Sequence, residues 1–113
     1  MNGTPVDVTT GQPLTGSWEV DHLVPRAEIA RDPRFARLSP LQQDSILLDV
    51  PENYLPMSKQ ANLSKSDWTV NEWIARRAAD GRPLPAAIAE ALREADRLAR
   101  AAIEARFGSF LGR

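Results

Sequence analysis

Two short segments, WEVDHLVP at residues 18–25 and NYLPMSKQANLSK at residues 53–65, carry most of the information about the fold of this chain. The first segment alternates apolar and polar residues until Pro25, which is the period of a half-buried strand. The second opens with a mainly apolar stretch at residues 53–57, which we expect to form the other strand of a small hairpin-like unit. Because Pro56 cannot donate to a strand ladder, this strand is expected at an edge.

Helical patterns fill most of the remaining chain. Short helical turns are expected over residues 26–38, and SPLQ at residues 39–42 is typical of a helix start, with the helix running to about residue 49. Another helix is expected to begin between residues 62 and 66 and to end at Asp80, before a glycine. The longest helix is expected from Pro85 to about Phe107, where apolar residues recur at three- and four-residue steps. The sequence therefore predicts a small, mostly helical α+β domain with a long C-terminal helix.

Composition limits both the domain organisation and the chemistry. A chain of 113 residues can bury one modest core. We expect residues 1–17, which are rich in Gly, Thr and Pro, to be a loop or a leader from a longer protein, and residues 18–113 to form one domain. The absence of cysteine and the single histidine exclude disulfides, thiol catalysis and sites built on two imidazoles. The sequence shows neither a signal peptide nor a membrane-spanning segment.

Charge is distributed unevenly along the chain. Residues 1–53 carry 4 Arg against 8 acidic residues, a net of −4, and residues 54–113 carry 10 Lys and Arg against 7 acidic residues, a net of +3. The sum of −4 and +3 is the overall net charge of −1. The second half could therefore face a polyanion, or it could be a helical surface in which opposite charges pair.

Candidate chemistry begins with the adjacent Asp21 and His22 at the end of the first expected strand. A neutral imidazole can take a proton from water near neutral pH, and a carboxylate can hold a hard cation such as Mg²⁺. On its own such a pair is usually a solvated acid beside a histidine of the core. The second segment adds Asn53, Asn62 and Lys65, an N-x₈-N-x₂-K spacing in which the last two residues would share a helix face.

These residues together resemble the ββα-metal (His-Me finger) unit of HNH endonucleases, in the variant with asparagine at the last position. The pattern is similar to the Asp-His…Asn…Asn…Lys nuclease domains of bacterial polymorphic toxins, and it covers about residues 5–75, with the core at about 18–75. The resemblance implies that His22 is the general base, that Asp21 and Asn62 hold one divalent cation, that Asn53 orients the histidine loop, and that Lys65 supports the scissile phosphate. Mg²⁺ is the expected cation, although Mn²⁺ or Ni²⁺ would suit the same ligands.

Two features depart from the family pattern. The stretch between His22 and Asn53 is longer than in compact members and is expected to hold an inserted helix. The zinc-knuckle cysteines of many HNH proteins are missing, so the fold must rest on apolar packing.

The resemblance implies a metal-dependent DNA endonuclease, in the setting of a bacterial toxin domain that is delivered within a larger secreted protein to the cytoplasm of a target cell. A cognate immunity protein is then the implied partner, besides DNA. The alternatives are a cytoplasmic phage, homing or restriction enzyme of the same class, a ribonuclease on the same fold, or a helical interaction module without catalysis.

Further basic and aromatic residues are candidates for nucleic-acid contacts. The expected phosphate contacts are Arg26, Lys59, Arg76 and Arg77, each of which could equally be a solvated surface residue. Core packing is the expected role of Trp18 and Trp73, whereas Trp68 is less constrained by the pattern. The long C-terminal helix is expected to pack on the core of its own domain rather than on a partner.

Overall fold

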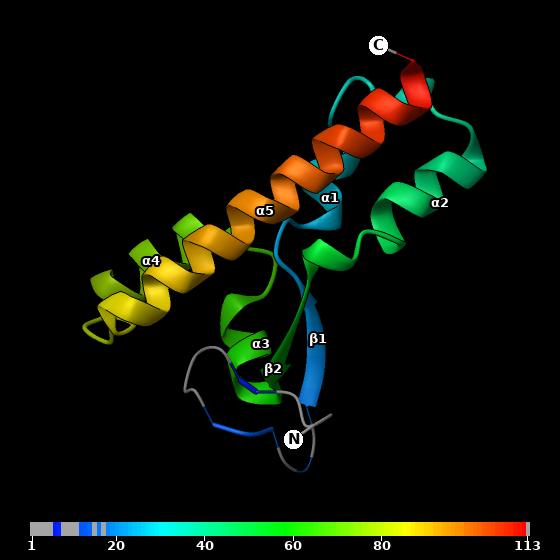
Figure 1. The fold of residues 1–113 in the computed structure, drawn as a ribbon. Coiled ribbons are helices and arrows are strands. Elements are labelled where there is room, and N and C mark those ends of the chain that lie inside the picture. Colours follow the sequence, from blue (N-terminus) through cyan, green and yellow to red (C-terminus); the bar gives the residue numbers. More distant parts are fainter. Residues whose placement is uncertain (1–5, 8–11, 15, 17, 113) are drawn as a thin grey trace.

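The computed structural model describes residues 6–7, 12–14, 16 and 18–112. Its only sheet within this described part joins β1 (Trp18–His22) and β2 (Tyr54–Ser58) in antiparallel register, with Trp18 opposite Ser58 and His22 opposite Tyr54. Both strands of a two-stranded sheet are edges, so Pro56 is tolerated as predicted. The α+β class, the helical majority and the long C-terminal helix are also confirmed (Figure 1).

The segment between the strands holds α1 (Arg26–Ala30), the 3₁₀ turn η1 (Phe35–Arg37), α2 (Pro40–Leu48) and the 3₁₀ turn η2 (Pro51–Asn53). The start of α2 is the one predicted: the Ser39 hydroxyl accepts from the backbone of Gln42, whose side chain accepts from the backbone of Ser39. The predicted helix between the two strands is therefore present.

One predicted helix is wrong, because the chain forms two helices where one was expected. The first, α3 (Lys59–Lys65), begins after Ser58, and the second, α4 (Val70–Ala79), ends before Gly81, which has a φ of +75°. Ser66 separates them with φ 49° and ψ −133°, a backbone conformation that costs energy in any residue with a Cβ. A second capping box, in Thr69–Glu72, starts the new helix, and this local signal prevails over continuous apolar periodicity.

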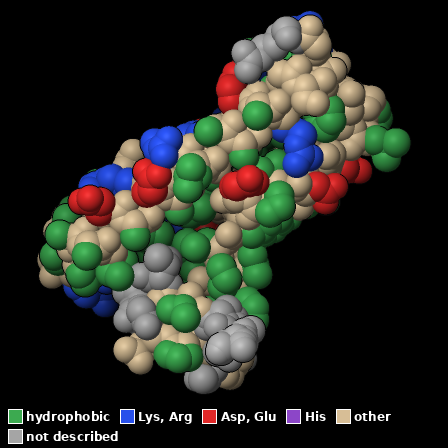
Figure 2. Space-filling model, in the orientation of Figure 1, with side chains coloured by type: hydrophobic (Ala, Val, Ile, Leu, Met, Phe, Trp, Pro, Cys, Tyr) green, Lys and Arg blue, Asp and Glu red, His purple; other side chains and the backbone are tan. Residues whose placement is uncertain are grey.

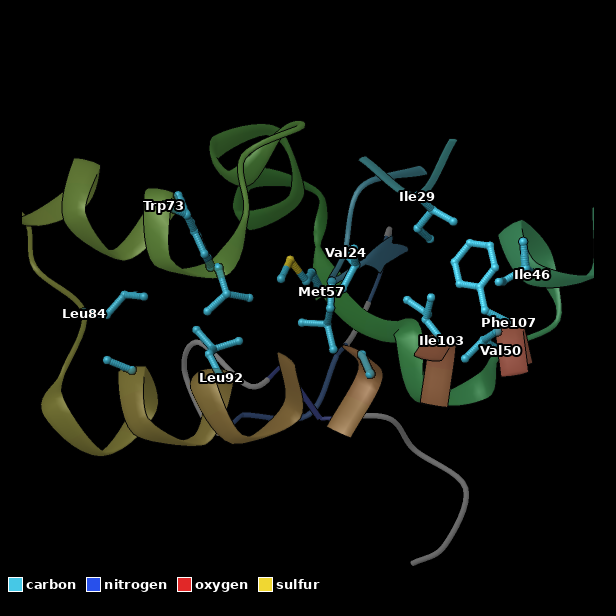
Figure 3. Packing of buried hydrophobic residues seen from close by; sticks show 14 of the residues in the cluster. Val24, Ile29, Ile46, Val50, Met57, Trp73, Leu84, Leu92, Ile103 and Phe107 are labelled. Carbon is cyan, nitrogen blue, oxygen red and sulfur yellow. The ribbon is translucent and has the colours of Figure 1, made fainter. Parts of the chain in front are cut away.

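The last helix, α5 (Ala86–Leu111), extends further than predicted and ends at Gly112 in the left-handed conformation. The core lies along this helix (Figure 3). Toward one end Leu92 packs with Trp73 and Leu84, and toward the other Phe107 packs among residues from α1 and α2. The expectation that α5 packs on its own domain is confirmed.

The tryptophans divide between the core and the surface. Trp73 is buried as predicted, but Trp18 is 40% exposed, so its predicted core role is wrong. Trp18 and Val20 lie on one side of β1 and stay exposed, whereas the polar Glu19 and Asp21 contact α3. Alternation in sequence identifies two faces of a strand, but it does not say which of them another element covers.

Part of the predicted leader packs against the domain. Among the described residues of 1–17, Val6 and Pro13 form an isolated β-bridge, and Asp7 and Leu14 are buried. The carboxylate of Asp7 accepts a hydrogen bond from the backbone N–H of Ser58, at the start of α3. The other residues of the predicted leader lie outside the described part.

Candidate functional site

A hollow of about 320 Å³ lies between the end of β1, the start of α1 and α3, and we call it the β1–α3 hollow. Its lining contains four of the residues selected from the sequence, brought together from three elements: Asp21, His22, Arg26 and Asn62. The remaining lining residues are Val20, Pro25, Leu63, Ser66 and Asp67. The antiparallel sheet makes this possible, because it returns the chain beside β1 just before α3 begins.

Lys65 lies behind the hollow and is fully buried. Its ammonium forms an ion pair with Asp21 at 2.8 Å and donates to the backbone carbonyls of His22 at 3.1 Å and Leu23 at 3.4 Å. The ammonium lies among these oxygens inside the protein and does not line the hollow, so the support of the scissile phosphate that the resemblance implied for Lys65 stays a prediction. These contacts hold the end of β1 in place.

Burial raises the pKa of the Asp21 carboxyl, against the opposing effects of the hydrogen bond and charge of Lys65. The carboxylate also accepts a hydrogen bond from the backbone N–H of His22. Since each carboxylate oxygen can accept more than one donor, Asp21 retains capacity for a cation on the side of the hollow.

Asn53 anchors the loop that follows His22. The side chain is buried; its Oδ1 accepts from the backbone N–H of Val24 at 2.7 Å, and its Nδ2 donates to the carbonyl of the same residue at 3.0 Å. Its own carbonyl accepts from the N–H of Leu23 at 2.9 Å. These are hydrogen bonds of the kind that the resemblance implied for Asn53, and together with Lys65 they fix the backbone on both sides of Leu23.

His22 is partly buried at the rim of the hollow, with its ring centroid 4.7 Å from that of Tyr54. Its Nε2 is buried and has no hydrogen-bond partner among the described residues. Burial lowers the pKa of the imidazole below 6.5, and the positive charge of Arg26 lowers it further, against the attraction of Asp21. The neutral form, which can accept a proton, is thus favoured at neutral pH.

We expect the titration of His22 to report this environment directly, because it is the single histidine of the chain. In the metal-free protein, the imidazole Cε1–H resonance should titrate with a pKa below 6.5. Arg26→Gln should raise that pKa, since it removes a cation that disfavours the imidazolium. Arg37→Gln, a change at an exposed arginine outside the hollow, should leave it unchanged. An equal response to both variants would contradict the assigned role of Arg26.

The donors in the hollow suit a hard cation that keeps much of its hydration. Asn62 Nδ2 donates to Glu19, which leaves the amide oxygen of Asn62 available beside the carboxylate of Asp21. Mg²⁺ is commonly bound by one or two protein oxygens with water in its other positions. Across the described residues, no group of three or more His, Cys, Asp or Glu side chains could hold a metal ion. Asp21 and Asn62 are thus the residues of the hollow that could hold an Mg²⁺ ion, with water in its other positions.

The predicted phosphate contacts divide into two groups. Arg26 lines the hollow, whereas Lys59, Arg76 and Arg77 do not. The guanidinium of Arg76 lies 4.9 Å from the ring centroid of Trp68, and Arg77 donates to the carbonyl of Arg82 at 2.8 Å. The structure thus brings one of these four residues, Arg26, to the hollow, and phosphate contacts by all four stay predictions.

Two of the four arginines of α5, Arg97 and Arg100, form ion pairs, which favours the second interpretation of the charge distribution for this part of the helix. Acidic and basic side chains are interspersed along the ridge of this helix in Figure 2. Arg97 pairs with Glu94, Arg100 pairs with Glu28 and Asp96, and Glu104 pairs with Arg34. Paired arginines attract a polyanion less than free ones, so these ion pairs reduce the basic character of α5.

Sequence reasoning missed several residues at or near the hollow. Glu19 could have been found, because it lies two positions before Asp21 on a strand and so points to the same side. The position of Tyr54 beside His22 can be known only from the register of the two strands. The positions of Ser66 and Asp67 at the hollow can be known only once the break between α3 and α4 is seen. No signal in the sequence distinguished the last two.

Comparisons with known proteins give no relative from which a function could be proposed, so a proposal has to start from the β1–α3 hollow. No protein-family model matches the chain, and no curated protein or solved structure matches it either.

Proposed function

We propose that this protein is a metal-dependent endonuclease of the HNH type that hydrolyses phosphodiester bonds in DNA. The observation that carries the proposal is the convergence of Asp21, His22 and Asn62 on one hollow. The order of elements supports it, because β1, β2 and α3 are two antiparallel strands followed by a helix, as a ββα-metal motif requires. The buried anchoring of the His22 loop by Asn53 and Lys65 supports it further.

In this mechanism His22 acts as the general base. Its neutral imidazole takes a proton from a water molecule as the water oxygen attacks phosphorus. The bond from phosphorus to the 3′ oxygen breaks, the leaving oxygen takes a proton from solvent, and the product carries a 5′ phosphate. Arg26 lies on the rim of the hollow, where its charge would hold the phosphate.

Asp21 and Asn62 would hold the divalent cation in this proposal. When bound, the cation supplies stabilisation of negative charge on the phosphate and on the leaving oxygen. Lys65 and Asn53 are positioning residues, because they fix the backbone that carries Asp21 and His22 without lining the hollow.

The biological setting that we propose is a bacterial toxin domain, delivered as part of a larger protein and neutralised in its producer by a cognate immunity protein. No helix in the described ranges has the length and apolar character needed to cross a membrane.

The decisive experiment is plasmid cleavage by the purified protein with Mg²⁺ and with a chelator. We expect nicking with Mg²⁺ and none with the chelator. Asn62→Ala should lower the rate by at least the roughly 10- to 100-fold that the loss of a single outer-shell metal partner costs. The matched control is Gln60→Ala, because Gln60 is an exposed residue on the same helix and does not line the hollow. Metal-dependent cleavage of RNA but not of plasmid would transfer the proposal to a ribonuclease. Cleavage of neither by folded protein would contradict it.

A further inference from the structure

A second hollow shares the turn between α3 and α4 with the β1–α3 hollow. It has a volume of about 340 Å³ and is lined by Ser66, Asp67, Trp68 and Glu72, and we call it the Trp68 hollow. The two hollows share Ser66 and Asp67 in their linings, so they are adjacent. The strained backbone of Ser66 creates this arrangement, since it turns the chain sharply between the two helices.

Trp68 is the aromatic residue of the second hollow. It is 37% exposed, and the guanidinium of Arg76 lies 4.9 Å from its ring centroid. A cation at this distance orients the indole through its π face and adds positive charge beside it. The face of the indole that Arg76 leaves open is a platform on which a planar ring can stack.

The linings of the two hollows differ in their basic residues. The β1–α3 hollow is lined by Arg26, which attracts a phosphate, together with the carboxylates of Asp21 and Asp67. The lining of the Trp68 hollow contains two acidic residues, Asp67 and Glu72, and no basic residue, so a phosphate has no cationic partner in that lining. A nucleobase is uncharged, and its ring nitrogens and amino groups can donate hydrogen bonds to carboxylates. A nucleobase therefore suits the Trp68 hollow better than a phosphate does.

We infer that the Trp68 hollow binds an unpaired nucleobase of the substrate, stacked on Trp68, next to the phosphate held in the β1–α3 hollow. The inference rests on the proposed nuclease function and specifies its substrate class. A base inside a duplex is covered by its neighbours on both faces, so the substrate is single-stranded or locally unpaired nucleic acid.

Binding of a short single-stranded DNA oligonucleotide in the presence of a chelator tests the inference without cleavage. Trp68→Ala should weaken binding by about 5- to 150-fold, the range found when one stacking aromatic is removed, and Trp68→Phe should retain part of the affinity. The matched control is Trp18→Ala, because Trp18 is exposed to a similar extent, 40%, and lines neither hollow. An oligonucleotide of the same length with abasic sugars should bind the wild type as weakly as the intact oligonucleotide binds Trp68→Ala.

Fluorescence identifies the tryptophan involved. We expect the oligonucleotide to quench the emission of the wild type and of Trp18→Phe, and to have little effect on Trp68→Phe. Equal affinity of Trp68→Ala and Trp18→Ala, or binding of the abasic oligonucleotide as tightly as the intact one, would overturn the inference.

The outcomes separate this inference from the proposed function. Metal-dependent cleavage that does not depend on Trp68, together with Trp68-independent binding, removes the base site and leaves the nuclease. Trp68-dependent binding by a protein that cleaves no nucleic acid supports the base site and removes the nuclease.

Discussion

Replacing His22 with alanine should lower the rate of plasmid nicking by about 100- to 10,000-fold, the contribution of a positioned general base. The imidazole lines the β1–α3 hollow, and its environment favours the neutral form that accepts a proton. The fold should be unaffected, because Nε2 has no hydrogen-bond partner within the described structure and the ring is only partly buried. Circular dichroism and the thermal midpoint of the variant check that it is folded.

Two further measurements make the His22→Ala result specific. Imidazole added to the buffer should restore part of the nicking activity, because the small cavity left by the side chain lies at an open hollow. Gln60→Ala serves as the control, since Gln60 is exposed on the neighbouring helix and does not line the hollow. Nicking at the wild-type rate by folded His22→Ala would remove the proposed mechanism.

The second large effect is expected on stability, from Lys65→Met. Methionine has a similar length and no charge, so the substitution leaves Asp21 as a buried carboxylate without its ion-pair partner. Breaking a buried pair in this way lowers the free energy of unfolding by about 3–5 kcal/mol. Lys59→Met should change it by less than about 0.5 kcal/mol, because Lys59 is exposed. Chemical denaturation near neutral pH in the presence of a chelator measures the free energy of unfolding of both variants.

The pH dependence identifies the cause of the loss in Lys65→Met. Burial already raises the pKa of Asp21 above 3.8, and the variant lacks the hydrogen bond and the charge that oppose this shift. A carboxyl group whose pKa is raised on folding contributes stability that is present below pH 3.8 and is lost as the pH rises through the raised value. The difference in the free energy of unfolding between the wild type and Lys65→Met should therefore become smaller as the pH is lowered toward 4.

A double variant keeps this prediction testable where Lys65→Met does not fold. Asp21→Asn combined with Lys65→Met removes the uncompensated charge and should recover part of the lost free energy of unfolding. The recovery is incomplete, because the backbone carbonyls of His22 and Leu23 still lack the donors that Lys65 supplied. The double variant could instead be no more stable than Lys65→Met, and the loss of free energy of unfolding relative to the wild type could be the same at every pH. That result would show that Lys65 acts through packing alone.

Much of the fold could be predicted because its signals are local. Ser39 and Gln42 close a capping box within four residues, and Gly81 ends α4 in the conformation that glycine adopts most easily. The candidate residues Asp21, His22 and Asn62 were also identified correctly as neighbours in space. The resemblance to the ββα-metal unit implied a strand and a helix that a sheet brings together, and the structure contains both.

Other features depend on contacts between distant parts of the chain. Lys65 donates to a carbonyl 43 positions away, and no local pattern indicates whether a lysine at a helix end will face water or a buried carboxylate. The exposed position of Trp18 has the same origin, since α3 covers the polar side of β1 and leaves the apolar side open.

The sequence by itself determined the order of the strands and of most helices, and many of their boundaries. These follow from backbone sterics and hydrogen bonds that act over a few residues. Only the tertiary structure decided that Lys65 is a buried partner of Asp21, that Arg26 and not Arg77 lines the β1–α3 hollow, and that Ser66 divides one expected helix into two. The physical reason is that burial, ion pairing and backbone strain depend on which distant elements pack together, and packing is a property of the whole chain.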